Sequence, residues 1–246
     1  MTTMNERLCE SARACLQNGR RLLDDSEFLE FGEPPTTAYF LSLIAQEEFA
    51  KAFLLALVVR GVIPWERRLL RAARDHTCKQ LLCIIMDYLN PDTDEFLERC
   101  NAGVLRHEIR KLPSKVVDAI NILRHEKIGR WVERTWVWDE DPEYDRDALA
   151  VAEGKQDRLK QDALYVRLAS DGSVAGVPSA ATYELVRSER ERASRIANLA
   201  ERVLEGDERP GLDYDKVEEV FRALFESLSE SALDAQANAA DTLQRG

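Results

Sequence analysis

The chain has 246 residues, of which 45% are hydrophobic and 32% charged, and its formal net charge is −11. This length provides for one large domain or two small ones, and the composition is that of a globular protein with a sizeable core. The negative charge argues against a protein that coats nucleic acid indiscriminately, and the N-terminus shows no pattern of a secretion signal.

The predicted elements are almost all helices. Apolar residues at helical spacing, together with Pro, Gly and Asn at the breaks, predict helices at residues 5–23, 36–60, 65–89, 94–110, 114–123, 148–164, 179–205 and 215–241. Between the sixth and seventh helices, the segment Tyr165–Leu168 precedes a turn at 171–173, which predicts a short hairpin or an extended arm. Because strands and helices do not alternate, we predict an all-α protein.

The most apolar predicted helix contains three charged residues. Residues 40–59 are apolar except for a few positions, which include Glu47, Glu48 and Lys51. At about 100° per residue, Lys51 lies between the two carboxylates, on a face whose other residues are apolar and which we expect to be buried. Charges on a buried face indicate either a structural ion cluster or a functional site. The longest uninterrupted apolar run, 52–59, is far shorter than the ~20 residues of a membrane span, so we expect no contact with a membrane.

The next predicted helix carries His76 and Lys79 one turn apart. Antiparallel packing through the short connection 61–64 would bring them near Glu47 and its neighbours. Arg71, five positions before His76, could hold a phosphate while His76 moves a proton, although on one straight helix these two side chains point about 140° apart. A lone histidine on a helix is also compatible with a hydrogen-bonded structural group.

A basic region lies in the middle of this acidic chain. Between Arg99 and Arg130 there are eight basic residues and three acidic ones. This pattern predicts either ordinary solvated helix faces or a local surface that binds RNA through Arg106, Arg110 and Arg124.

Motifs for metal and cofactor chemistry are absent from the sequence. His107-Glu108 and His125-Glu126 each begin the zinc motif HExxH, but Lys111 and Gly129 stand where the second histidine belongs. No histidine follows a glutamate by three residues, as a di-iron bundle requires, and there is no phosphate-binding glycine loop. We therefore expect no metal and no cofactor. The five cysteines form no CxxC pair, which indicates free thiols in a reducing cytoplasm.

Three motifs resemble a known family. The sequence QEEFAKA at 46–52, then His76-Thr77-Cys78-Lys79, then KQDALYV at 160–166 are similar to the EE-x-G-K-A, H-x-x-K and L-Y-V-D motifs of the AbiV family of abortive-infection proteins. The resemblance covers about residues 6–202, with the motifs in the family's order. Ala50 replaces the usual Gly, and Arg167 replaces the usual Asp.

The resemblance implies a fold, a process and a set of residues. AbiV-like proteins are grouped with the HEPN superfamily, compact helical domains that often dimerise and include many metal-independent RNases. It thus implies a HEPN-like domain at 1–205 and a cytoplasmic antiviral-defence protein that is a homodimer. The helix that the residues predict within 206–246 would pack on the core or at a dimer interface. The family-pattern positions are Glu47, Glu48, Lys51, His76, Lys79 and Tyr165. Arg71 to His76 also matches the R-x(4–6)-H motif of the RNase members, but Ala72 stands where a polar residue is usual, and His76 lies on an earlier helix than the catalytic one.

Whether the chain is an enzyme stays open. As a metal-independent endoribonuclease it would use His76 as general acid or base, Arg71, Lys79 or Lys51 to hold phosphate, and Glu47 and Glu48 to hold these cations in place. As a non-enzymatic module it would bind a phage or host protein, and the same cluster would be structural. A third interpretation is an RNA-binding subunit without cleavage. A site must be open to solvent, whereas a polar core is closed and fully paired.

Overall fold

The structure, a computed structural model, describes residues 2–29, 35–90, 113–128, 144–178, 181–206 and 221. These residues form eight α-helices, one π-helix and one two-stranded hairpin, which confirms the predicted all-α fold. The helix predicted at 94–110 lies outside the described residues, as do Arg106 and Arg110, and of the helix predicted at 215–241 only Phe221 is described. The division of the chain at residue 205 therefore stays a prediction.

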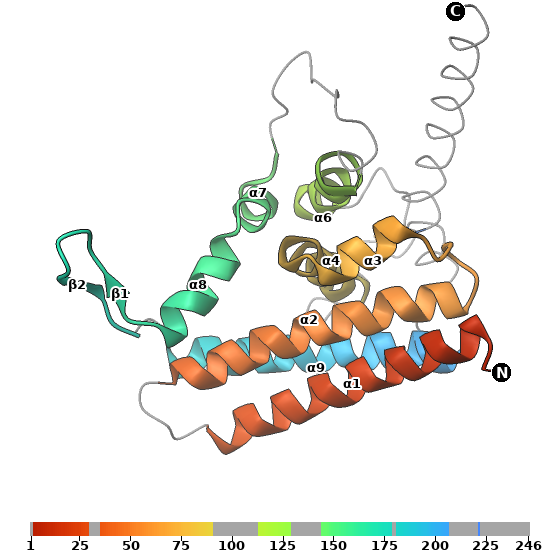
Figure 1. Ribbon diagram of the computed structural model, residues 1–246, viewed down its shortest axis with the longest axis horizontal. Helices are drawn as coiled ribbons and strands as arrows, with labels where there is room; N and C mark the ends of the chain where they lie inside the picture. The colour runs from red at the N-terminus through yellow and green to blue at the C-terminus, as the bar shows by residue number, and fades with distance from the viewer. Residues whose placement is uncertain are drawn as a thin grey trace, which may run out of the picture.

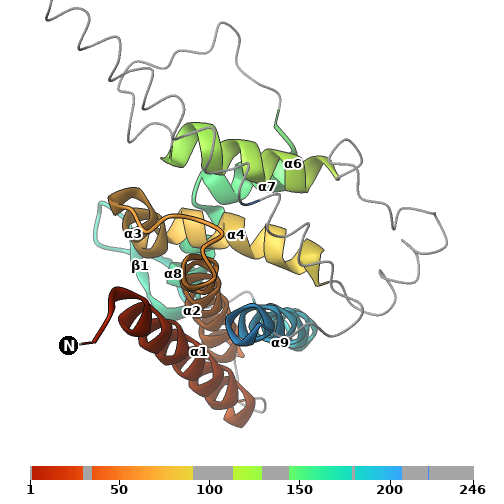
Figure 2. The same ribbon diagram turned by 90° about the vertical axis from the view of Figure 1, so that its right-hand side faces the viewer.

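Three long helices lie side by side at the base of the molecule (Figures 1 and 2). They are α1 (Met4–Phe28), α2 (Thr36–Val59) and α9 (Tyr183–Glu205). The first begins with a capping box, in which Thr3 accepts a hydrogen bond from the backbone of Glu6 and Glu6 accepts one from the backbone of Thr3. Close contact between α1 and α2 depends on Gly19, because a Cβ atom there would lie 2.7 Å from a ring carbon of Phe49.

The other elements cover the upper side of α2 in two layers (Figure 2). The inner layer crosses α2 and the outer layer packs on the inner one. The inner elements are α3 (Arg67–Arg74), α4 (His76–Leu89) and α8 (Lys155–Leu164). The outer elements are α6 (Ser114–Asn121), the π-helix η2 (Ile122–Ile128) and α7 (Arg146–Ala152). Strands β1 (Arg167–Leu168) and β2 (Val174–Gly176) pair antiparallel beyond the end of α8.

Helix α2 is the centre of the core because other helices surround it. Phe49 and Phe53 are fully buried, and the ring of Phe221 meets Phe53 edge-on at 5.1 Å. The face that we expected to be buried is instead the less covered one, since Phe40 and Val58 are only half-buried. The prediction was wrong because neighbours on several sides bury α2 almost all round, and the Glu48–Lys51 side receives the least cover.

Several predicted helix boundaries also differ from the structure. The helix predicted at 65–89 is two helices, because Asp75 has an extended backbone and its carboxylate accepts a hydrogen bond from the backbone of Cys78, which begins α4. The helix predicted at 148–164 is interrupted where Gly154 takes a φ of 77°. Helix α1 continues to Phe28, beyond the predicted end at residue 23, and an Arg21–Asp25 ion pair lies along the added turn.

Two further expectations can be compared with the described residues. Cys9, Cys15, Cys78 and Cys83 are free thiols, as predicted. In the part of the chain that the structure describes, no helix combines the length and apolarity needed to cross a membrane.

Candidate functional site

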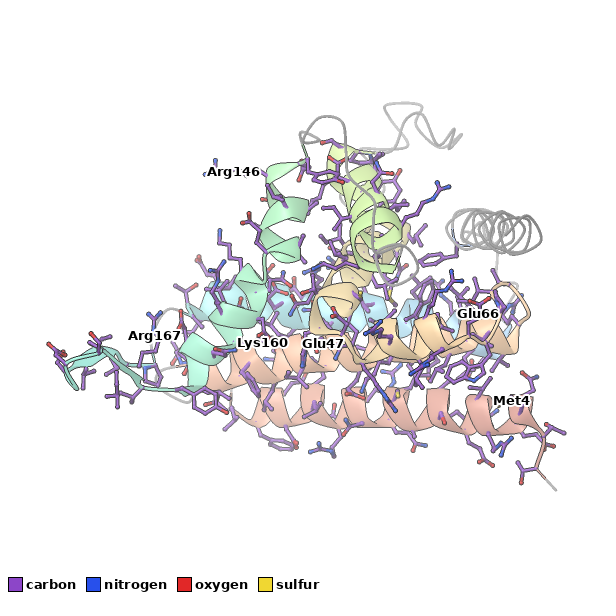
Figure 3. The ribbon with its side chains drawn as sticks, turned by 45° about the horizontal axis from the view of Figure 1, so that its top comes forward. Met4, Glu47, Glu66, Arg146, Lys160 and Arg167 are labelled. Atoms are coloured by element: carbon purple, nitrogen blue, oxygen red, sulfur yellow. The ribbon has the colours of Figure 1, made fainter. Side chains whose placement is uncertain are left out.

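A buried carboxylate, Glu47, is the centre of a polar cluster between three helices. Its Oε1 accepts hydrogen bonds from Lys160 Nζ at 2.5 Å and Gln80 Nε2 at 3.1 Å. Its Oε2 lies 2.7 Å from both Lys79 Nζ and His76 Nδ1. We call these five residues the Glu47 cluster. Figure 3 shows Lys160 beside Glu47, although 112 residues separate them in the chain.

Local structure explains why these side chains converge. Asp75 starts α4 immediately before His76, so the start of that helix carries His76 and Lys79, and Gln80 at the next position, toward α2. Helix α8 approaches from the other side and supplies Lys160. The ammonium of Lys160 is held in place by Asp157 one turn earlier, at 2.9 Å from Asp157 Oδ1.

The cations of the cluster keep Glu47 ionised. Burial alone would raise the pKa of Glu47, but the ammonium groups of Lys79 and Lys160 outweigh burial and lower this pKa to about 2. The carboxylate is therefore negative at neutral pH and can only accept hydrogen bonds. Its four donors match the roughly four acceptor directions of a carboxylate. The Glu47 carboxylate is thus fully paired, whereas Oε1 of the buried Gln80 side chain has no hydrogen-bond partner in the described part of the chain.

His76 differs from the other members of the cluster because it reaches the surface. Its side chain is 56% exposed, whereas that of Glu47 is 3% exposed. Because the ionised carboxylate can only accept, Nδ1 of His76 carries the proton and donates it to Glu47 Oε2. In the neutral ring, the other nitrogen, Nε2, holds the lone pair, and it lies on the edge of the ring turned away from Glu47. The cluster therefore fixes one histidine tautomer at the surface.

The predicted site residues divide into three groups. Glu47, His76 and Lys79 meet, as we expected from antiparallel packing of their predicted helices, and Lys79 is buried. Glu48 and Lys51 form an ion pair with each other on α2.

The remaining predicted residues lie elsewhere in the fold. Arg71 is exposed in the last turn of α3, and Arg124 is half-buried in η2. Tyr165 is exposed at the C-terminal end of α8.

Sequence reasoning missed two members of the cluster, Lys160 and Gln80. Lys160 lies within the segment that resembles the family's L-Y-V motif, and Asp157 one turn earlier is a local sign of an ion pair. Gln80 lies one turn after His76, on the same side of α4. Neither signal identifies Glu47 as the partner, because that contact depends on how α8 and α4 pack on α2.

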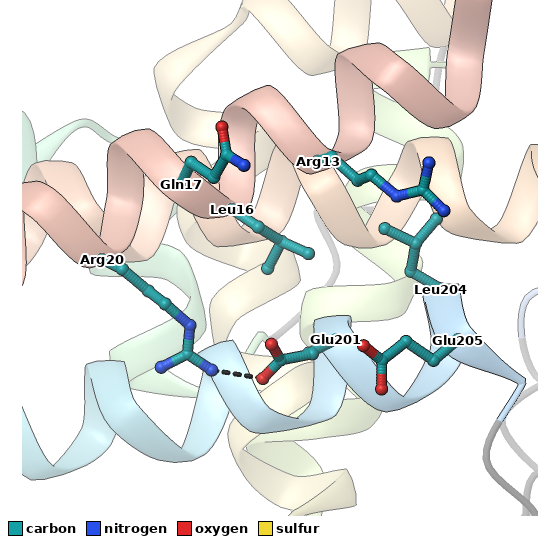
Figure 4. A pocket seen from close by; sticks show the side chains of 7 residues that line it. All are labelled: Arg13, Leu16, Gln17, Arg20, Glu201, Leu204 and Glu205. Atoms are coloured by element: carbon teal, nitrogen blue, oxygen red, sulfur yellow. Dashed lines mark hydrogen bonds and ion pairs between the residues drawn. The ribbon is translucent and has the colours of Figure 1, made fainter. Parts of the chain in front are cut away.

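A concave region lies apart from the Glu47 cluster, and none of the five cluster residues lines it. It is a cleft of about 210 Å³ between α1 and α9, with Leu16 and Leu204 among its lining residues (Figure 4). An ion pair between Arg20 and Glu201 already spans it. Within the described ranges, no group of three or more His, Cys, Asp or Glu side chains could hold a metal ion.

Comparison with known proteins gives one match. The sequence model of the HEPN_AbiV family, described as AbiV, matches residues 7–205 of the chain. The match includes α1 to α9 and every member of the Glu47 cluster. No curated protein and no solved structure matches the chain.

Proposed function

The chain belongs to the AbiV family of HEPN-type abortive-infection proteins, and we propose that it limits phage infection as a metal-independent endoribonuclease in which His76 transfers the proton. Membership supports the process, abortive infection, and the Glu47 cluster supports the chemistry. We place this activity in the bacterial cytoplasm, on RNA as substrate, as the resemblance implies.

One observation carries the proposed chemistry. An ionised, buried carboxylate holds Nδ1 of an imidazole that is more than half exposed. A carboxylate that orients the ring in this way leaves Nε2 of His76 as a proton acceptor with a defined direction. Buried structural histidines have no need for an exposed second nitrogen.

The proposed step balances without a further reactant. Nε2 of His76 takes the proton from a ribose 2′-hydroxyl, and the 2′-oxygen forms a bond to the adjacent phosphorus. The bond from phosphorus to the 5′-oxygen breaks, and that oxygen takes a proton from water, while Nε2 of His76 later returns its proton to water. A cyclic phosphate and a free 5′-hydroxyl remain. Lys79 and Lys160 are buried on Glu47, so the exposed Arg71 is the better candidate to meet the phosphate charge.

A second candidate function also has an observation in its favour. The carboxylate of Glu47 has a full set of donors, and both lysines of the cluster are buried. A closed polar cluster of this kind is what a structural core would contain. The protein would then be a non-enzymatic module that binds a phage or host protein, and His76 would be the outer edge of that core.

Cleavage of labelled RNA in EDTA distinguishes the two candidates. The matched set is wild type, His76→Asn and Lys155→Gln. Asparagine keeps an N–H donor near the position of Nδ1 but has no equivalent of Nε2, and Lys155 is an exposed residue of α8. We expect wild type and Lys155→Gln to cut RNA, and His76→Asn to cut at least about 100-fold more slowly.

Phage plating on cells that express each variant completes the test. If His76→Asn melts like wild type and still protects the cells, catalysis by His76 is wrong and the interaction module is favoured. If wild type protects but cuts no RNA, the ribonuclease proposal is wrong as well. Loss of both cleavage and protection in the folded variant supports the proposal.

A further inference from the structure

The hairpin forms an arm that projects from the helical body. We define the arm as residues 165–178, which contain β1, the turn and β2. Figure 1 shows it extending beyond the end of α8, away from the three long helices. It is tied to α8 by an ion pair between Arg167 Nε and Asp162 Oδ1 at 3.1 Å. The start of the arm is therefore held on α8, and its turn projects away from the helices.

A β-bulge makes the two faces of the arm unequal. Arg167 pairs with Gly176 and Leu168 pairs with Val174, so Ala175 is the extra residue. Leu168 and Val174 consequently share one face. Alternation along each strand adds Val166 and Val177 to the same face, because each lies one residue beyond the Arg167–Gly176 pair.

The opposite face of the arm is polar and already occupied. The guanidinium of Arg167 lies over Gly176, where a Cβ atom would be 3.2 Å from its Nε. Glycine therefore leaves room for the arginine that binds Asp162. One face of the arm is therefore covered by the Arg167 side chain, and the other face is apolar.

The apolar face is open to solvent. Leu168 is 69% exposed and Val174 is 61% exposed, and Val166, Val177 and the neighbouring Tyr165 are exposed to a similar extent. An isolated two-stranded hairpin is marginally stable in water, and a contiguous exposed apolar patch is typical of an interaction site. Both features indicate that another chain packs on the apolar face of the arm.

We propose that the apolar face of the arm binds the arm of a second copy of this chain. The protein carries a net charge of −11, but the arm contains only one basic and one acidic residue, Arg167 and Asp171. Two copies can therefore meet at their arms without the repulsion that opposes contact elsewhere, and a strongly charged partner finds no complementary charge on this face.

Symmetry and area also favour a second copy. A two-fold axis places a strand antiparallel to its own copy, so the same apolar residues meet each other across the axis. The arm spans only residues 165–178, fewer than the roughly 20–30 residues that each partner gives to a standard interface, and reciprocal pairing uses both arms. We therefore expect a reversible dimer that dissociates on dilution. This inference does not depend on RNA cleavage.

Sedimentation velocity of the full chain over roughly 1 to 100 µM tests the proposal, since small interfaces dissociate in this range. The arm variant is Leu168→Glu with Val174→Glu. The matched control is Met4→Glu with Leu149→Glu, which adds the same charge at two exposed apolar residues outside the arm. We expect wild type and control to dimerise with rising concentration, and the arm variant to stay monomeric with an unchanged melting temperature. A monomeric wild type, or an arm variant that dimerises like wild type, overturns the proposal.

A cysteine cross-link tests the geometry. In Val174→Cys the two introduced thiols would lie close together across the two-fold axis, so mild oxidation should give a covalent dimer. Wild type, with its own free thiols, is the control for background cross-linking. If the variant forms no more covalent dimer than wild type, the arms do not pair face to face. If the arm variant loses phage protection while wild type is a monomer, the arm binds another macromolecule and the second copy is wrong.

Discussion

Two charged clusters join α4 to its neighbours, and they differ in one respect. The Glu47 cluster connects α4 with α2 and α8. A second cluster, which we call the Asp87 cluster, connects α4 with α9 through Arg192 Nε at 3.1 Å and Arg195 Nη2 at 2.9 Å from the Asp87 carboxylate. In both clusters a single carboxylate receives cations from another helix, so both stabilise the packing of helices by the same means.

The difference lies in the proton-transfer capacity of the partners. The guanidinium groups of Arg192 and Arg195 stay charged at every ordinary pH, so the Asp87 cluster offers no partner that exchanges a proton. The Glu47 cluster includes an imidazole, the side chain that accepts and releases protons most readily near neutral pH, and it presents this group at the surface. An ion cluster between helices is thus evidence of packing, and an exposed histidine on it is evidence of a site.

The largest expected effect is the loss of the Glu47 carboxylate. Glu47→Ala leaves the ammonium groups of Lys79 and Lys160 buried with no carboxylate between them. We expect the free energy of unfolding to fall by about 3–5 kcal/mol, as measured by urea denaturation. Glu48→Ala is the control, because Glu48 forms its ion pair with the half-buried Lys51 on its own helix, and we expect a smaller loss. Equal losses for the two variants would contradict the central role of Glu47.

The stability contributed by Glu47 should depend on acid pH. Its pKa is about 2 in the folded chain against an ordinary value of 4.5. A lowered folded pKa means that the stabilisation, on the order of 3 kcal/mol, is complete above the unfolded pKa and is lost as pH falls from about 5 toward 2. The difference in unfolding free energy between wild type and Glu47→Ala should therefore shrink across this range.

A variant without a titrating group provides the comparison for this pH series. Gly19→Ala should destabilise the chain because its Cβ would clash with the ring of Phe49. Its difference from wild type should stay constant between pH 5 and 2. If the Glu47→Ala difference is also constant, Glu47 does not titrate as the geometry requires.

The sequence predicts the fold and three of the five members of the Glu47 cluster for definite reasons. Apolar periodicity identifies the helices, and the short connection 61–64 turns the chain back toward α2, so the approach of Glu47 to His76 and Lys79 follows from the chain itself. The contact of Lys160 with Glu47 does not follow, because it requires that α8, more than 100 residues further along the chain, packs on α2. The break at Asp75 sets the direction of the His76 side chain. It depends on the hydrogen bond from the backbone of Cys78 to the Asp75 side chain, which competes with a continuous helix.

The covered face of α2 illustrates the same limit. Glu47 and Glu48 are adjacent in the sequence, and the pattern around them is apolar on nearly every side. A pattern without a polar face cannot indicate which neighbours cover which side. Only the packing shows that Glu47 faces α4 and α8, while Glu48 lies on the less covered side with Lys51.

A moderate effect is expected from the Asp87 cluster. Asp87→Ala removes the carboxylate that holds Arg192 and Arg195, but Glu189 still lies 3.6 Å from Arg192. We expect a loss of about 1–3 kcal/mol in the free energy of unfolding and no change in RNA cleavage at a temperature where the variant is folded. If the folded variant loses cleavage to the same degree as His76→Asn, the distinction between a packing cluster and a reactive cluster is wrong.

The smallest effect on stability is expected from the residue with the largest expected effect on activity. His76→Asn keeps a donor toward Glu47 and removes a side chain that is more than half exposed, so the free energy of unfolding should change by less than about 1 kcal/mol. Cleavage should nevertheless be lost, because asparagine has no nitrogen that accepts a proton. A core residue would show the opposite pattern, with a large loss of stability, and urea denaturation beside the RNA assay separates the two. If His76→Asn is strongly destabilised and Asp87→Ala is not, the Glu47 cluster is the structural one and the comparison reverses.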